Sequence, residues 1–246
     1  MRIGLLADLH ANREAVEACV KALEAAGCGR WVILGDLVGY GAEPGWVVDW
    51  VRERVADGAI AVLGNHDQAV VAGNADSMGP VIGAVTAWTH SVLDQQQLAF
   101  LDGLPLQVVD EDRLYVHANA AAPADWAYVS NRLAATKSLL ATPAWLSFCG
   151  HVHEPALYYL QAGSASHFAP GSGVAIPLSS QRRWLAIPGS CGQPRDGNPA
   201  AACAWFDTAT RQLGFLRVPY NHELSAQKIR AAGLPQVFAQ RLSEGF

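Results

Sequence analysis

Five short apolar stretches of this chain each end in one or two side chains that could bind a metal ion. Each stretch reads as a buried strand. The stretches are Ile3–Ala7, Trp31–Leu34, Ala59–Leu63, Leu114–Val116 and Trp145–Cys149. The side chains at their ends belong to Asp8, His10, Asp36, Asn65, His117, His151 and His153. This repetition constrains the fold more than any single motif does.

The carboxyl ends of parallel strands are the natural meeting point for such side chains. Parallel strands deliver these ends to one edge of the sheet, where open α/β folds bind their ligands. Carboxylate, amide and imidazole groups gathered there could hold two divalent cations close together. Two metals that share a bridging carboxylate are a common apparatus for in-line attack on phosphorus. The pattern therefore predicts a two-metal phosphoesterase.

Size and charge restrict the partners of the chain. Its 246 residues are 51% hydrophobic and 16% charged, which indicates a globular protein, and we expect a single domain over residues 1–246. The net charge is −5 and no cluster of Lys and Arg occurs, so we expect no strong nucleic-acid footprint. No apolar run is long enough to span a bilayer, so no membrane partner is expected. The oligomeric state stays open.

The cysteines and the first strand indicate the cellular compartment. Five cysteines are odd in number and form no C-x-x-C pair, so buried thiols in a reducing compartment fit better than a disulfide framework or a zinc knuckle. The first strand begins at Arg2 and reaches Asp8 almost at once, so a cleavable signal peptide would remove the chemistry. We therefore expect a cytoplasmic protein.

The first third of the chain alternates strands and helices. Residues 13–26 have helical apolar spacing, and Pro44 suits the first turn of a second helix. Asp36 follows Asp8 by 28 residues, and Asn65 follows Asp36 by 29. Each interval is about one βαβ step, so we expect the three loops to be neighbours on a parallel sheet.

The remainder of the chain predicts a second sheet. Residues 78–101 read as one or two helices, and residues 106–117 read as a hairpin that turns at Asp110-Glu111-Asp112. Short strands separated by Gly, Pro, Ser and Asn follow up to residue 218. A helical tail, interrupted at Gly233-Leu234-Pro235, ends the chain. These elements indicate an α/β (α+β) fold with two packed sheets.

The motifs differ in specificity. Asp8-Leu9-His10 and Gly35-Asp36 are weak alone, because D-x-H is common by chance and Asp after Gly often starts a turn. Gly64-Asn65-His66-Asp67 is more specific, although an Asx-turn would also explain it. A lone strand-end histidine such as His117 is more often structural than a ligand. Gly150-His151-Val152-His153 is strong, because two imidazoles two residues apart at a strand end serve metals well.

Taken in chain order, these motifs resemble those of the calcineurin-like metallophosphoesterase superfamily. The segments 35–41, 188–197 and 219–220 look like its small bacterial and archaeal phosphoesterase branch. The resemblance implies a four-layer αββα sandwich with two mixed β-sheets. It also implies a cofactor of two divalent metal ions, drawn from Mn, Fe, Zn and Co.

The resemblance further implies a role for each motif residue. One metal would take Asp8, His10 and His153, and the other would take Asn65, His117 and His151. Asp36 would bridge them. A hydroxide held between the metals would attack phosphorus in line, and His66 would protonate the leaving alkoxide.

Three positions depart from the protein Ser/Thr phosphatase branch of the superfamily. That branch and the related diadenosine tetraphosphatases carry phosphate-binding arginines where this chain has Leu63 and Tyr40, which weakens a protein-phosphatase interpretation. The same branch orients its catalytic histidine with an Asp at the position of Gly39. The group that orients His66 here is therefore open. Asp67 is adjacent and is a candidate, with a structural turn role as the alternative.

Two further residues are candidates for substrate binding. Arg195, in a glycine-rich segment, is the best-placed positive group, although it could instead pin its own loop through Asp196. Asn12 could contact substrate, or it could cap the amino end of the first helix, which is the commoner role at such a position.

We expect hydrolysis of phosphodiester or small phosphomonoester bonds. A second hypothesis is a metal-binding interaction scaffold on the same fold, since the superfamily includes members that have lost catalytic residues. His66 separates the two, because a scaffold can dispense with it and this chain retains it. A nuclease is a third hypothesis, and the lack of a basic surface argues against long polynucleotides but not against short or cyclic nucleotides.

Overall fold

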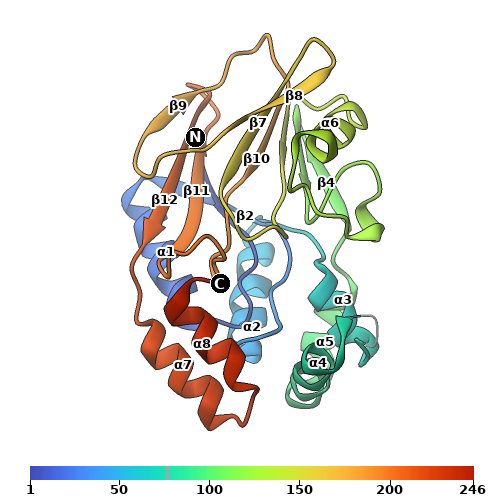
Figure 1. Ribbon diagram of the computed structural model, residues 1–246, viewed down its shortest axis with the longest axis vertical. Coiled ribbons are helices and arrows are strands. Elements are labelled where there is room, and N and C mark those ends of the chain that lie inside the picture. Colours follow the sequence, from blue (N-terminus) through green and yellow to red (C-terminus); the bar gives the residue numbers. More distant parts are fainter. Residues whose placement is uncertain (76–77) are drawn as a thin grey trace.

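The computed structural model of the protein describes residues 1–75 and 78–246 and contains two six-stranded sheets with helices around them (Figure 1). The first sheet has the strand order β3-β2-β1-β11-β12-β9. Strands β1, β2 and β3 are parallel, and the others pair antiparallel. The bounds are β1 (Arg2–Leu6), β2 (Cys28–Ile33), β3 (Ile60–Ala61), β9 (Ala175–Pro177), β11 (Ala201–Asp207) and β12 (Gln212–Val218).

The second sheet has the order β4-β5-β6-β10-β7-β8. Its central strands β5, β6 and β10 are parallel, with antiparallel pairs at both sides. The bounds are β4 (Gln107–Asp110), β5 (Arg113–Val116), β6 (Leu146–Phe148), β7 (Ala156–Gln161), β8 (Ser164–Phe168) and β10 (Trp184–Ile187). Each sheet thus contains three parallel strands.

Eight α-helices and a short 3-10 helix are found in the part of the chain that the structure describes. The bounds are α1 (Arg13–Ala25), α2 (Pro44–Ala56), α3 (Asn65–Ala72), α4 (Pro80–Val92), α5 (Gln95–Asp102), η2 (Pro123–Asp125), α6 (Arg132–Leu140), α7 (His222–Ala231) and α8 (Gln236–Glu244). In Figure 1 the C-terminal pair α7 and α8 (red) lies at the same end of the molecule as α3, α4 and α5 (teal).

Alternating side chains of the central strands create separate hydrophobic layers. Leu5 and Val32 face the second sheet, whereas their neighbours Leu6 and Ile33 face α1 and α2. Successive residues of a strand point to opposite faces, so a strand covered on both faces is a continuous apolar run. On the far side, Leu185 of β10 packs with α6 in a third cluster. The layers confirm the four-layer αββα sandwich with two mixed sheets.

Most of the expected elements are present. The hairpin with its turn at residues 110–113 and the break between the last two helices lie where the sequence placed them. The sequence did not indicate α3, α6 or β8. It also placed Asn65 at a strand end, whereas this residue begins α3.

Two further observations concern the cysteines and the membrane. All five cysteines are free and buried, in agreement with the expectation of buried thiols. Among the described residues, no helix combines the length and the apolar character that crossing a membrane requires.

Candidate metal centre

The seven predicted ligands lie where strands from both sheets end. Asp8 and His10 follow β1, Asp36 follows β2, and Asn65 begins α3 just after β3. His117 follows β5 of the second sheet, and His151 and His153 follow β6. The backbone N–H of His151 donates to both carboxylate oxygens of Asp8, at 2.9 and 3.1 Å, which ties the loops of the two sheets together. The site therefore spans the two sheets.

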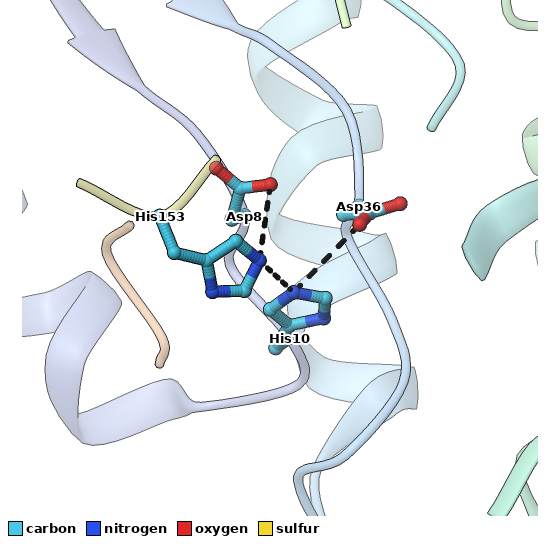
Figure 2. Close-up of side chains that lie close together, drawn as sticks. All are labelled: Asp8, His10, Asp36 and His153. Carbon is cyan, nitrogen blue, oxygen red and sulfur yellow. Dashed lines mark hydrogen bonds and ion pairs between the residues drawn. The ribbon is translucent and has the colours of Figure 1, made fainter. Parts of the chain in front are cut away.

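One group of ligand atoms contains Asp8, His10, Asp36 and His153 (Figure 2). The Nε2 atoms of His10 and His153 are 3.1 Å apart. The same Nε2 of His10 is 3.7 Å from Oδ2 of Asp36, and Nε2 of His153 is 3.5 Å from Oδ1 of Asp8. All four side chains are buried. Their donor atoms face a common point.

A second group contains Asp36, His117 and His151. Nε2 of His117 is 3.4 Å from Oδ2 of Asp36, 3.1 Å from Nδ1 of His151 and 3.2 Å from Oδ1 of Asn65. Asp36 is the residue that the two groups share. Its Oδ2 lies between His10 on one side and His117 on the other, which is the position of a bridging ligand.

Backbone carbonyls fix which nitrogen of each of the four candidate ligand histidines carries a hydrogen when the ring is neutral. Each imidazole has one nitrogen within hydrogen-bond distance of a carbonyl oxygen, to which it donates. The pairs are His10 Nδ1 with Val38 at 3.0 Å, His117 Nδ1 with Leu34 at 2.7 Å, His151 Nε2 with Trp126 at 2.8 Å and His153 Nδ1 with Gln193 at 2.6 Å. The other nitrogen of each neutral ring then carries a lone pair, and it is this nitrogen that faces the ligand groups.

This arrangement fits a pair of cations. Two lone pairs 3.1 Å apart, as on His10 and His153, repel each other unless a proton or a metal ion lies between them. The same holds for His117 and His151. Mixed imidazole and carboxylate donors suit first-row transition metals and zinc. The residues present therefore fit divalent metal ions, and they include the residues that the family resemblance names as ligands.

Burial and neighbouring charges have opposing effects on the pKa values of the acids and imidazoles at the site. Burial raises the pKa of Asp8 to about 7. Burial would also raise the pKa of Asp36, but the charges on His117 and His66 hold it well below its ordinary value. Burial alone would lower the pKa of His117, but the Asp36 carboxylate beside it raises that pKa to about 9. Burial lowers the pKa of His151 to about 4.

The backbone at the site is strained. Five of the seven ligands adopt a left-handed φ, between 47° and 68°, which non-glycine residues rarely do. These five are Asp8, His10, Asp36, His151 and His153. Such outliers cost of order 1–3 kcal/mol each and cluster at functional sites. The strained conformations thus lower the free energy of unfolding, and the rest of the fold must offset this cost.

A close contact with Asp36 explains why position 64, the first of the motif Gly64-Asn65-His66-Asp67, is a glycine. A Cβ at this position would lie 2.2 Å from the backbone nitrogen of Asp36 and 2.2 Å from its Oδ1. Oδ1 of Asp36 also accepts a hydrogen bond from the backbone N–H of His66 at 2.9 Å. Only glycine lets the start of α3 approach the shared carboxylate this closely.

The structure places His66 at the site and gives Asp67 a structural contact. His66 is buried, and burial lowers its pKa. Its Nδ1 has no hydrogen-bond partner among the residues that the structure describes. The carboxylate of Asp67 accepts hydrogen bonds from the backbone N–H groups of Gly64 at 3.0 Å and Val38 at 3.1 Å, the turn role that was its alternative. Whether Asp67 also acts in catalysis stays a prediction.

Arg195 lies beside the first ligand group. Its Nη2 is 3.3 Å from the hydroxyl of Tyr40. Burial lowers the pKa values of His10 and His153, and the positive charge of Arg195 lowers them further. Its Nε is buried and has no hydrogen-bond partner within the described chain. The alternative of an ion pair with Asp196 is wrong, because Asp196 pairs with Arg217 at 3.0 Å.

Asn12 caps the first helix, as its commoner role predicts. Its Oδ1 accepts from the backbone N–H of Ala15 at 3.3 Å, and its Nδ2 donates to Gly192 at 2.8 Å. The Ser225 hydroxyl also donates to Oδ1. Both ends of the amide therefore have hydrogen-bond partners within the protein. Substrate contact by Asn12 stays a prediction.

A cleft of about 650 Å³ opens beside the second ligand group, and the sequence did not indicate its aromatic residues Trp126 and Tyr128. Asn65, His66 and His151 line it together with Trp126 and Tyr128. Tyr128 stacks on His151 with ring centroids 4.0 Å apart. Both aromatic residues belong to an irregular segment after β5, where no periodicity signals their position.

Known proteins resemble this chain over its whole length. An uncharacterized protein of Methanocaldococcus jannaschii is 30% identical over 248 residues, which cover 99% of this chain and 98% of that protein. The crystal structure of a metallophosphoesterase from Sphaerobacter thermophilus matches with a TM-score of 0.88 and 35% identity, covering 100% of this chain and 99% of the other. A hypothetical protein from Pyrococcus horikoshii shares the fold, with a TM-score of 0.80, 18% identity and 100% and 98% coverage.

The sequence model of the calcineurin-like phosphoesterase superfamily domain matches residues 1–211. This range includes every ligand of the two groups around Asp36. The chain therefore belongs to the calcineurin-like phosphoesterase superfamily.

Proposed function

We propose that this protein is a phosphoesterase with a dinuclear metal centre that hydrolyses phosphodiester or small phosphomonoester bonds. The observation that carries the proposal is the position of Asp36, whose carboxylate belongs to both ligand groups. Two cations bound there would activate water for in-line attack and offset the charge that develops on the phosphoryl oxygens. A cytoplasmic location remains part of the proposal.

The chain supplies the remaining groups. Arg195 would bind a phosphoryl oxygen through its guanidinium, because a guanidinium suits phosphate geometry. His66 would donate a proton to the leaving oxygen as the P–O bond breaks. Its Nδ1 is buried, so Nε2 is the atom that would carry this proton toward the cleft. A bound phosphoryl anion would favour the charged imidazole that burial disfavours.

The cleft favours a diester over a monoester. Among its described lining residues there is no Lys, Arg, Asp or Glu. Such a wall accepts an uncharged leaving group, and the rings of Trp126 and Tyr128 favour a flat one. The amides of Gln68 and Asn65 provide hydrogen-bonding groups on the same surface. A phosphodiester with an aromatic ester group matches these features.

The test compares bis-p-nitrophenyl phosphate with p-nitrophenyl phosphate, in Mn²⁺, for the natural protein and for Asp36→Asn. We expect diester hydrolysis by the natural protein and its loss in Asp36→Asn, because the neutral amide is a poor bridge. Asp57→Asn is the matched control, since the side chain of Asp57 is 73% exposed at the end of α2. Equal rates for Asp36→Asn and the natural protein would refute the mechanism.

A panel of nucleotides would then identify the substrate. Turnover of small nucleotide esters but not of polynucleotides would agree with the net charge of −5. A protein that holds metal yet turns over no ester in the panel would instead favour the interaction scaffold.

A further inference from the structure

The C-terminal helices touch the loops that carry the site. Residues 212–246 lie outside the matched family domain, and α7 and α8 form a helical hairpin within them. Lys228 of α7 pairs with Glu14 and Glu43, one beside each of the loops that follow β1 and β2. The carbonyl of Gly245 accepts from the N–H of Gly197 at 2.9 Å, close to Arg195 in the chain. This hairpin is therefore attached to three loops of the metal centre.

Tyr40 connects the hairpin to the metal centre. Its ring lies 4.9 Å from the ring of Phe238 on α8, and the two belong to one buried hydrophobic cluster. On its other sides it lies 4.4 Å from the ring of His10 and 4.5 Å from the ring of His66. Tyr40 adopts a φ of 62°, a strained conformation for a tyrosine. Packing from the hairpin offsets that strain.

The orientation of His66 depends on packing. Its Nδ1 is buried without a hydrogen-bond partner in the described residues, and the neighbouring carboxylate of Asp67 is occupied by backbone N–H groups. Gly39 lets the ring lie against the backbone, since a Cβ there would be 2.8 Å from Nδ1. The rings of His10 and Tyr40 meet it edge to face, at 5.1 and 4.5 Å. Aromatic rings thus contact the imidazole, whose Nδ1 has no hydrogen-bond partner in the described part of the chain.

We propose that Tyr40, held in place by Phe238 of the C-terminal hairpin, is the positioning residue for His66. The inference rests on the proposed role of His66 as the proton donor. In this arrangement α8 stabilises the rotamer of Tyr40, and Tyr40 limits the rotamers of His66. The hairpin would therefore affect catalysis without contacting the substrate. The hydroxyl of Tyr40 has a separate contact with Arg195, so the ring and the hydroxyl can be tested independently.

The kinetic test uses two diesters that differ in the need for a proton. Diphenyl phosphate has a poorer leaving group than bis-p-nitrophenyl phosphate, so proton donation matters more for its hydrolysis. We expect Tyr40→Leu to lower kcat on diphenyl phosphate by about 100-fold, the lower end for general acid catalysis, and to affect bis-p-nitrophenyl phosphate far less. Tyr40→Phe keeps the ring and should retain the ratio of the two kcat values. Phe238→Ala should shift this ratio in the same direction as Tyr40→Leu.

The control is Phe168→Ala, because Phe168 lies on β8 and is 48% exposed. We expect it to leave both kcat values unchanged. An equal loss on both diesters in Tyr40→Leu would overturn the positioning role, since a general loss of folding or metal affects both reactions alike.

A second readout does not depend on activity. Crystal structures of Tyr40→Leu and Tyr40→Phe, each with its Mn content measured, should show His66 rotated or split between rotamers only in Tyr40→Leu, with Mn content unchanged in both. A single unaltered His66 rotamer in Tyr40→Leu would overturn the inference. Should the natural protein hydrolyse neither diester, the proposed function fails, while the rotamers of His66 still decide the role of Tyr40.

Discussion

The Nε2 atoms of His10 and His153 face each other across 3.1 Å in the interior of the protein. In each ring the other nitrogen, Nδ1, donates its hydrogen to a backbone carbonyl. This arrangement makes the site favour a cation. Two buried lone pairs so close together are unfavourable unless a positive charge lies between them. Backbone carbonyls from the loops after β2 and β10 thus hold both neutral rings in the tautomer and orientation that a cation requires.

Metal binding should release protons near neutral pH. The pKa of His117 is raised to about 9 in the presence of the Asp36 carboxylate, so below pH 9 its Nε2 holds a proton that a metal must displace. We expect Mn²⁺ affinity to increase by about tenfold per pH unit from pH 7 to 9 and to level off above that. Titration calorimetry in two buffers of different ionisation enthalpy measures the protons released. An affinity independent of pH over this interval would contradict a protonated His117 in the metal-free site.

Substitution of Gly64, which lies directly against Asp36, should weaken metal binding. Gly64→Ala would place a methyl group 2.2 Å from the backbone and carboxylate of Asp36, so α3 or the loop after β2 must move. We expect metal affinity to fall by about 10- to 100-fold, as for other losses of ligand support. Gly83→Ala is the control, because Gly83 is in α4 with open space around it, and it should raise stability by about 0.5–1 kcal/mol. Wild-type metal affinity in Gly64→Ala would contradict the role of this close contact.

Arg195 should contribute to substrate binding rather than to metal binding. Removal of a hydrogen bond from a charged donor costs about 1.5–3 kcal/mol, so Arg195→Ala should lower kcat/KM for bis-p-nitrophenyl phosphate by about 10- to 100-fold. Arg182→Ala provides the control, since Arg182 stacks on Tyr159 of β7. Inductively coupled plasma spectrometry should find the same Mn content in both variants. Loss of Mn from Arg195→Ala would assign the guanidinium to the metal centre instead.

The sequence predicted the elements whose signal is local. Asp8, Asp36 and Asn65 follow strands buried on both faces, so their runs are continuous and apolar, and the βαβ spacing identified the neighbours. The helix α6 was missed because residues 132–140 carry no strong apolar period, and β8 was missed because Ser164–Phe168 is largely polar. In both cases contacts with the rest of the fold, more than local sequence, determine the structure.

The parts of the site that the sequence did not predict depend on contacts between distant residues. Tyr40 was noticed only as the replacement of an arginine, because its contact with Phe238 joins segments almost at opposite ends of the chain. Trp126 and Tyr128 reach the cleft from an irregular loop, where neither a helical nor a strand period applies. The pairing of Asp196 with Arg217 likewise joins the loop before β11 to strand β12, which are not adjacent in the sequence.

The most direct measurement is the anomalous scattering of Mn²⁺ in crystals of the natural protein. We predict two peaks about 3.5–4 Å apart, one among Asp8, His10 and His153 and the other among Asn65, His117 and His151, with the Asp36 carboxylate between them. Asp36→Asn should weaken both peaks, because both ions lose the same ligand. A single peak, or two peaks that do not share Asp36, would contradict the dinuclear centre.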